Sequence, residues 1–141
     1  MKYVGIKSCP QKRKALKREG KIQVVAVADL VARDCSRHLY VLAGYGREYT
    51  DYQLSTGKTP VEAEKKVRSY NKLCMALATR GYQPEKYGYI TVSENGARLD
   101  GSHRAAWLLC RGVKEVEVRV VPMDMTPELE KHLEEQRRAY C

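Results

Sequence analysis

The sequence predicts an α+β domain, a small mixed β-sheet with packed helices, over residues 1–141. Runs of β-branched residues that suit strands alternate with segments of helical periodicity. Capping residues and glycines mark the ends of the helical segments. Asn95-Gly96 separates two short apolar runs, as a hairpin turn does. The resulting order of strand, helix, hairpin, helix, strand and helix is typical of helices packed on a small sheet.

The first half of the chain begins with a short basic helix expected over residues 10–19, with Pro10 at its start and Gly20 after its end. Residues 22–28 are a compact β-branched run, which predicts a buried strand. Between residues 29 and 52 the pattern leaves helix and strand both open.

The strongest helix signal covers residues 59–80. Thr59 suits the N-cap, Pro60 the first helical position, and Glu62 completes a capping box. Gly81 supplies the left-handed stop. One face of this helix is apolar and is expected to be buried: Val67, Tyr70, Leu73, Cys74 and Leu77.

The second half is expected to contain two strands joined as a hairpin, a helix, a further strand and a polar last helix. Gly112 stops the first of these helices, and Thr126 caps the second. The expected ranges are 87–93, 97–100, 102–111, 115–121 and 126–140.

The composition fits a globular domain, with 43% hydrophobic and 30% charged residues. No run approaches the roughly 20 apolar residues of a membrane helix, so no membrane partner is expected. The N-terminus lacks the apolar block of a signal peptide, which favours a cytoplasmic location. The five cysteines are scattered and show no metal-ligand spacing. We therefore expect no metal held by protein side chains, and buried free thiols at Cys74 and Cys110.

The net charge of +9 is concentrated in residues 1–21. We treat this segment as a basic N-terminal extension. Positive charge of this density either contacts nucleic acid or forms a solvated helix without a partner, and the sequence leaves both open.

The residues that best indicate chemistry are Asp100, Gly101, Ser102, His103 and Arg104. A strand ends, the glycine turns the chain, and a helix begins, whose first N–H groups have no partner within the helix. Two basic residues in the first turn oppose the helix dipole unless an anion binds there. The pattern therefore predicts a phosphate site. The alternative is that Asp100 pairs with Arg104 and that the histidine only packs.

A second group of candidates lies upstream. Tyr45, Tyr49 and Tyr52, with Arg47, either line a ligand pocket or form an amphipathic surface loop, and we favour the loop. Trp107 is interpreted as a packing residue rather than a platform for base stacking.

Together these segments resemble the ParB/sulfiredoxin-like superfamily. The resemblance covers residues 22–121, which would form the core of one domain, with residues 126–140 as a C-terminal helix. It is carried by residues 22–30, 90–92, Gly96, 99–106, Gly112 and 116–118. It implies a nucleotide phosphate held by Asp100, Gly101, Ser102, His103 and Arg104. The nucleotide would be ATP or ADP, or else CTP, with Mg²⁺.

Within that superfamily the Asp-Gly-x-His-Arg form is closest to the free serine kinase-like members. Sulfiredoxins carry a catalytic cysteine where Ser102 stands here, and partition proteins carry Gly-Glu-Arg-Arg and a following helix-turn-helix domain. In the kinase-like members an acidic residue after the first strand acts as general base. That resemblance implies catalytic roles for Asp34, Glu48 or Asp51, with His103.

The expected function is therefore a nucleotide-dependent phosphotransferase, acting on an unknown small-molecule acceptor, or a nucleotide hydrolase. The alternatives are a non-enzymatic DNA- or RNA-binding or regulatory module of the ParB type, and a protein that holds a phosphorylated metabolite without turning it over.

Overall fold

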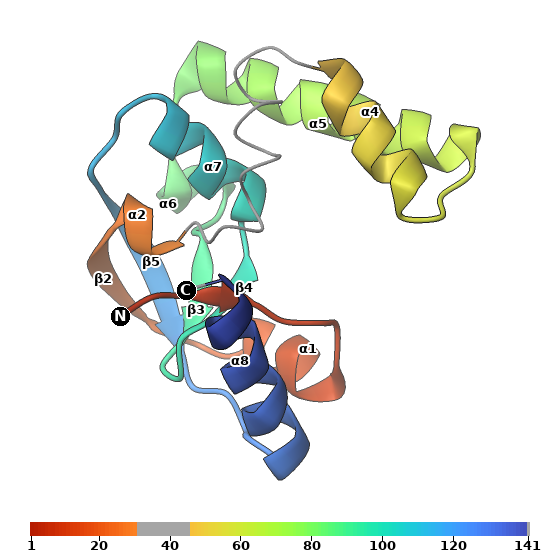
Figure 1. The fold of residues 1–141 in the computed structure, drawn as a ribbon. Helices are drawn as coiled ribbons and strands as arrows, with labels where there is room; N and C mark the ends of the chain where they lie inside the picture. The colour runs from red at the N-terminus through yellow and green to blue at the C-terminus, as the bar shows by residue number, and fades with distance from the viewer. Residues whose placement is uncertain (31–45, 141) are drawn as a thin grey trace.

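A five-stranded mixed sheet in the order β1-β4-β3-β5-β2 forms the centre of the protein. The computed structural model describes residues 1–30 and 46–140, except for the side chains of residues 46–48 and 140. Helices pack on this sheet, which confirms the α+β class (Figure 1). The strands are β1 (Val4–Gly5), β2 (Lys21–Ala26), β3 (Thr91–Ser93), β4 (Ala97–Asp100) and β5 (Glu115–Val121). The helices are α1 (Pro10–Leu16), α2 (Val27–Leu30), α4 (Gly46–Ser55), α5 (Pro60–Arg80), α6 (Pro84–Tyr87), α7 (Ser102–Cys110) and α8 (Pro127–Tyr140).

The sheet combines parallel and antiparallel pairs. β3 and β4 form an antiparallel hairpin, β3 runs parallel to β5, and β2 runs antiparallel to β5 over six residue pairs. β1 runs parallel to β4. The Asn95-Gly96 turn is confirmed, with Gly96 at φ +87°. Because β1 pairs with β4, part of the expected N-terminal extension belongs to the sheet.

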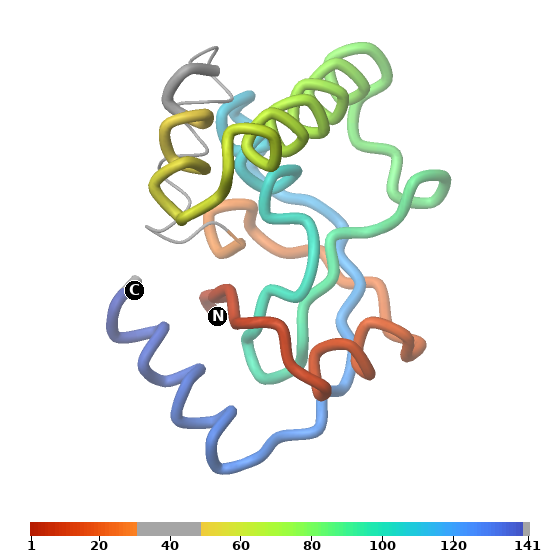
Figure 2. The backbone as a smooth tube through the Cα atoms, turned by 90° about the vertical axis from the view of Figure 1, so that its right-hand side faces the viewer, coloured from red at the N-terminus to blue at the C-terminus, as the bar shows by residue number. Residues whose placement is uncertain are grey.

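Each face of the sheet carries its own apolar core, because alternate residues of a strand point to opposite faces. One core lies under α2 and α7, and the other lies under α1 and α8. α4 and α5 lie at the opposite end of the molecule from α1 and α8 (Figures 1 and 2). The first core contains Tyr3, Val25, Val27, Leu30, Ile90, Val92, Ala105, Leu108, Val116 and Val118. The second contains Val4, Ile6, Ala15, Ala97, Leu99, Val121, Met123, Leu129 and Leu133.

The capping signals correctly located the long helices. The Glu62 N–H donates to Thr59 Oγ1 at 3.2 Å, and α5 ends at Gly81, which has φ +72°. The Leu129 N–H donates to Thr126 Oγ1 at 3.1 Å at the start of α8. These contacts involve residues close in sequence, which is why the sequence alone located them.

The prediction of a buried strand over residues 22–28 is wrong in two respects, the burial of the strand and its last residue. β2 is the last strand of the sheet and ends at Ala26. Ile22 is 47% exposed and Val24 is 55% exposed. A β-branched run predicts a strand but does not reveal whether both of its faces will be covered.

Three other expectations also differ from the structure. The strand expected over 87–93 begins only at Thr91, because residues 84–87 form α6 and Gly88, at φ +100°, ends it. α1 stops at Leu16, whose carbonyl accepts a hydrogen bond from Arg119 at 3.0 Å. Cys110 is exposed rather than buried, because it follows the part of α7 that packs on the core.

A matched pair of leucine substitutions tests this assignment of the core. Leu108 on α7 is 3% exposed, whereas Leu54 on α4 is 40% exposed. We expect Leu108→Ala to lower the free energy of unfolding by about 2–5 kcal/mol, through lost burial and a residual cavity. Leu54→Ala should cost less than about 1 kcal/mol. Urea denaturation measures both, and equal losses would contradict the assignment.

Candidate functional site

The site begins where β4 passes into α7. Gly101 occupies the N-cap position in the left-handed region, at φ +95° and ψ +23°, and no side chain caps the helix. The first helical hydrogen bond runs from the Ala105 N–H to the Gly101 carbonyl at 2.9 Å. The N–H groups of residues 102–104 therefore precede the hydrogen-bond ladder at the positive end of the helix dipole. The first turn contains no acidic residue.

Gly101 is required here by the fold itself. Its positive φ is strained for residues with a side chain. A Cβ atom at this position would also lie 2.8 Å from Cγ1 of Ile90, which is fully buried. The sequence pattern suggested a glycine that admits a ligand. The structure gives it the additional role of packing the start of α7 directly on β3.

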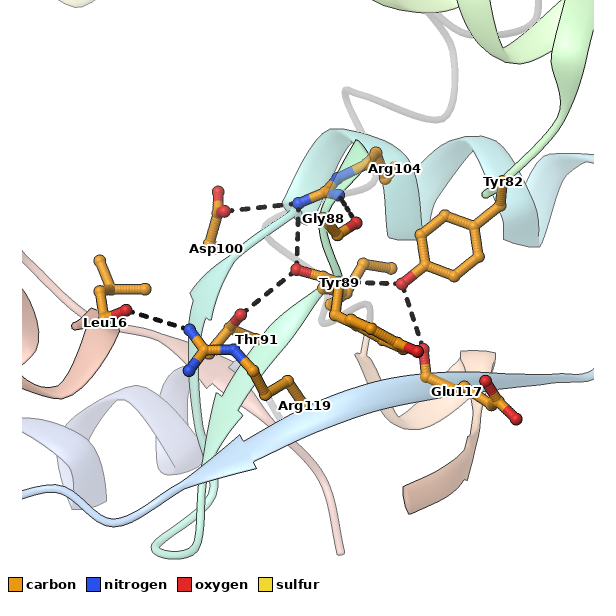
Figure 3. A network of polar contacts seen from close by, with 10 residues as sticks. Leu16, Tyr82, Gly88, Tyr89, Thr91, Asp100, Arg104, Glu117 and Arg119 are labelled. Atoms are coloured by element: carbon orange, nitrogen blue, oxygen red, sulfur yellow. Dashed lines mark hydrogen bonds and ion pairs between the residues drawn. The ribbon is translucent and has the colours of Figure 1, made fainter. Parts of the chain in front are cut away.

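Arg104 joins the start of α7 to the segment before β3 (Figure 3). Its guanidinium donates to the Gly88 carbonyl at 2.6 Å and more distantly to the Tyr89 carbonyl at 3.4 Å. It also forms the expected pair with Asp100, at 3.4 Å. The Asp100 side chain is 61% exposed, and such surface pairs are weak. Arg104 is thus held mainly by neutral carbonyls, which leave most of its positive charge in place.

Tyr82 holds the same segment from the other side (Figure 3). Its hydroxyl accepts a hydrogen bond from the Ile90 N–H at 2.9 Å and donates to the Glu117 carbonyl at 3.1 Å. Arg104 and Tyr82 therefore fix the main chain of residues 88–90 between β5 and α7.

His103 packs against two tyrosine rings, as the structural alternative expected. Its ring lies 5.7 Å from that of Tyr49, edge to face, and 5.8 Å from that of Tyr70. The tyrosine rings lie 4.7 Å apart. These contacts bring α4 and α5 against α7. The surface loop favoured for Tyr49 is wrong, because this residue lies in α4 and is 2% exposed.

A cavity of about 180 Å³ opens beside Arg104. Its wall is formed by the C-terminal end of α5, by α6 and by the segments that follow each of them. Arg80 and Arg104 both line it, and no carboxylate of the part of the chain that the structure describes does. The guanidinium of Arg80 stacks on the Tyr87 ring, with 3.5 Å from Cζ to the ring centroid. Sequence reasoning missed Arg80 and Tyr87, because their positions in the chain give no sign that they lie beside Arg104.

A larger cavity of about 640 Å³ lies between the start of α1 and the first turns of α8, and Lys7, Cys9 and His132 line it. It shares no lining residue with the Arg104 cavity. None of residues 100–104, which the sequence indicated as a phosphate site, lines this larger cavity.

Of the three expected catalytic acids, Asp51 is the one whose side chain the structure describes, and it does not line the cavity beside Arg104. Asp34 lies outside the described residues. Glu48 lies in α4, and its side chain is not described. Asp51 is exposed on α4, and its position two residues from Tyr49 directs it away from His103. Across the described ranges no group of His, Cys, Asp and Glu residues has the arrangement that holds a metal ion.

The basic N-terminal segment is partly paired. Lys14 and Arg18 both contact Asp124, at 3.0 and 2.9 Å. Their hydrogen bonds lower the pKa of this carboxyl group. Because Asp124 offsets only one of the two positive charges of Lys14 and Arg18, the N-terminal segment keeps a net positive charge. In residues 1–30 and 46–140 no helix has the length and apolar composition that crossing a membrane requires.

Comparisons with family models, with curated proteins and with solved structures gave no match to this chain. The resemblance to the ParB/sulfiredoxin-like superfamily therefore stays a prediction.

The buried tyrosine next to His103 predicts a loss of stability at high pH. Burial, with a contact to Cys74, raises the pKa of Tyr70 far above its usual value. The resulting stabilisation is complete below pH 10 and is lost as the pH rises above it, because the unfolded tyrosine then ionises first. We expect Tyr70→Phe to reduce the decline in unfolding free energy above pH 10 by up to about 1.4 kcal/mol per pH unit. Denaturation at about pH 9 and about pH 11 measures this, and parallel declines would contradict it.

Proposed function

We propose that this protein binds the phosphate groups of a nucleotide, ATP or ADP, between the first turn of α7 and the C-terminal end of α5. The observation that carries the proposal is the pair of arginines, Arg80 and Arg104, lining one cavity beside a helix start that has no acidic residue in its first turn.

The electrostatics of the cavity favour an anion. Two arginines line it, and none of the described lining residues is acidic. The weakly paired Asp100 is the acidic group next to Arg104 in Figure 3, and its side chain is largely exposed. Arginine presents planar donors that match phosphate oxygens, and the positive end of the α7 dipole adds to the same field.

The arginines are also held in place before a ligand arrives. Arg104 is oriented by the Gly88 and Tyr89 carbonyls, and Arg80 by the ring of Tyr87. Donors held in this way lose little conformational freedom on binding. His103 would contribute its main-chain N–H, since its ring packs on Tyr49 and Tyr70.

The proposed reaction is transfer of a phosphoryl group to a small-molecule acceptor, or hydrolysis of the nucleotide. Both depend on positioning and on neutralisation of phosphate charge, which the two arginines would provide. Mg²⁺ would enter with the phosphates, whose oxygens supply part of its ligands. The acid that orients the acceptor would be Asp34 or Glu48, because Asp51 is exposed and directed away from His103. CTP is the other nucleotide to be tested, and a phosphorylated metabolite held without turnover is the simpler form of the same proposal.

Titration calorimetry with ATP, ADP and CTP, with and without Mg²⁺, tests the binding site. We expect Arg80→Ala and Arg104→Ala each to weaken binding by about 10- to 100-fold, the effect of losing one charge-assisted hydrogen bond. Arg68→Ala is the matched control, because Arg68 is an exposed arginine of the same helix as Arg80 and pairs with Glu64. It should leave the affinity unchanged.

The unfolding free energy of each variant is measured alongside, since Arg104 also holds the main chain. The Arg80 side chain makes no such hydrogen bond to the main chain among the described residues, so a loss of affinity in Arg80→Ala would not come from a loss of main-chain contacts. Absence of binding by the unmodified protein, or equal losses in Arg80→Ala and Arg68→Ala, would overturn the proposal.

A second candidate function, contact with nucleic acid through residues 2–21, is supported by the excess positive charge around α1 after Asp124 is paired. It predicts DNA or RNA affinity that falls steeply with salt. A gel-shift series at several salt concentrations measures it. Lack of binding at low salt removes this candidate.

A further inference from the structure

The sheet has one long open edge. β2 is its last strand and pairs only with β5 among the described residues. In Figure 1 no described helix lies outside it. Ile22 and Val24 are about half exposed on one face of this strand.

The main chain shows which residues face that edge. The Val27 N–H donates to the Lys114 carbonyl at 2.9 Å, next to the aligned pair Ala26 and Glu115. Because the hydrogen-bonding groups of successive residues alternate between the two edges of a strand, those of Val25 and Gln23 also point to β5. The N–H and C=O groups of Ile22, Val24 and Ala26 therefore point outward, where no described residue bonds to them.

This edge lacks the features that usually prevent pairing. Residues 22–26 contain no charged residue and no proline, and the register with β5 has no bulge. The opposite edge of the sheet, β1, is only two residues long. The two edges thus differ, because β1 is short, whereas β2 is long and carries its charged residue, Lys21, at its first position.

We propose that a second copy of this chain pairs with β2, antiparallel across a two-fold axis at Val24. In this register Val24 faces the Val24 of the other copy, and Ile22 faces its Ala26. All three outward residues of each copy then form hydrogen-bonded pairs. Ile22 and Val24 of the two copies also form one apolar stripe across the joint, which removes their exposed surface from water.

The charge beside this edge fits a copy of the chain. A cavity of about 430 Å³ lies along the strand, and Asp29 and Glu94 are its charged lining residues. Lys2 pairs with Asp29 at 3.4 Å, and among the described residues no ion pair includes Glu94. The register brings Lys21 of one copy to the Ala26 end of the other, where Asp29 follows. The surface along β2 is therefore not positive, although the whole chain carries a net charge of +9.

Sedimentation equilibrium of the full chain over a range of concentrations tests the proposal. The expected result is a reversible dimer. Val24→Pro removes an N–H group that points away from β5, so the sheet of each monomer keeps its hydrogen bonds. Val24→Lys places like charges opposite each other at the axis. We expect each to raise the dimer dissociation constant by about tenfold or more.

Met75→Lys is the matched control, since Met75 is 72% exposed on α5 and the change adds the same charge far from β2. It should leave the dissociation constant unchanged. A protein that stays monomeric at every concentration overturns the proposal. So does a dimer that is equally stable in the Val24→Pro variant, or one that Met75→Lys weakens as much as Val24→Lys. Circular dichroism establishes that the Val24 variants are folded.

Discussion

The guanidinium of Arg104 is the contact on which the arrangement of the site depends. It connects the first turn of α7 to the carbonyls of Gly88 and Tyr89. No sequence pattern among neighbouring residues would predict that these two segments meet. Because Gly88 and Tyr89 lie just before β3 in the chain, the same contact helps to position α7 over the sheet. Carbonyl groups orient the cation without neutralising it, so a structural contact also leaves positive charge at a helix start.

Packing around this contact explains why glycine occupies position 101. The backbone turns with a positive φ and lies so close to Ile90 that a Cβ atom would collide with it. The glycine that suggested a ligand loop in the sequence is thus also explained by the fold. What the fold does not explain is the placement of Arg80 and Arg104 around one cavity whose described lining contains no carboxylate. This arrangement is the basis of the proposed phosphate site.

α4 and α5 attach to the rest of the protein through aromatic contacts. Tyr49 and Tyr70 pack on each other and on His103, so one ring at the start of α7 meets both helices. Because α5 also supplies Arg80, the position of this helix affects the cavity beside Arg104. The stability of the aromatic contacts and the geometry of the arginine pair are therefore coupled through the same helix.

The sequence by itself determined the features that depend on neighbours along the chain. Thr59 with Glu62, the Asn95-Gly96 turn, and the glycine stops at Gly81 and Gly112 each act over a few residues, so the class of fold and the long helices could be predicted. Burial could not, as Ile22, Val24 and Cys110 show, because it depends on which elements cover a residue. Tertiary structure alone decided that Arg80 and Arg104 line one cavity, that Tyr49 meets His103, and that β2 is an edge. Each of these features depends on residues far apart in sequence, which come together only through the packing of helices on the sheet and the pairing of its strands.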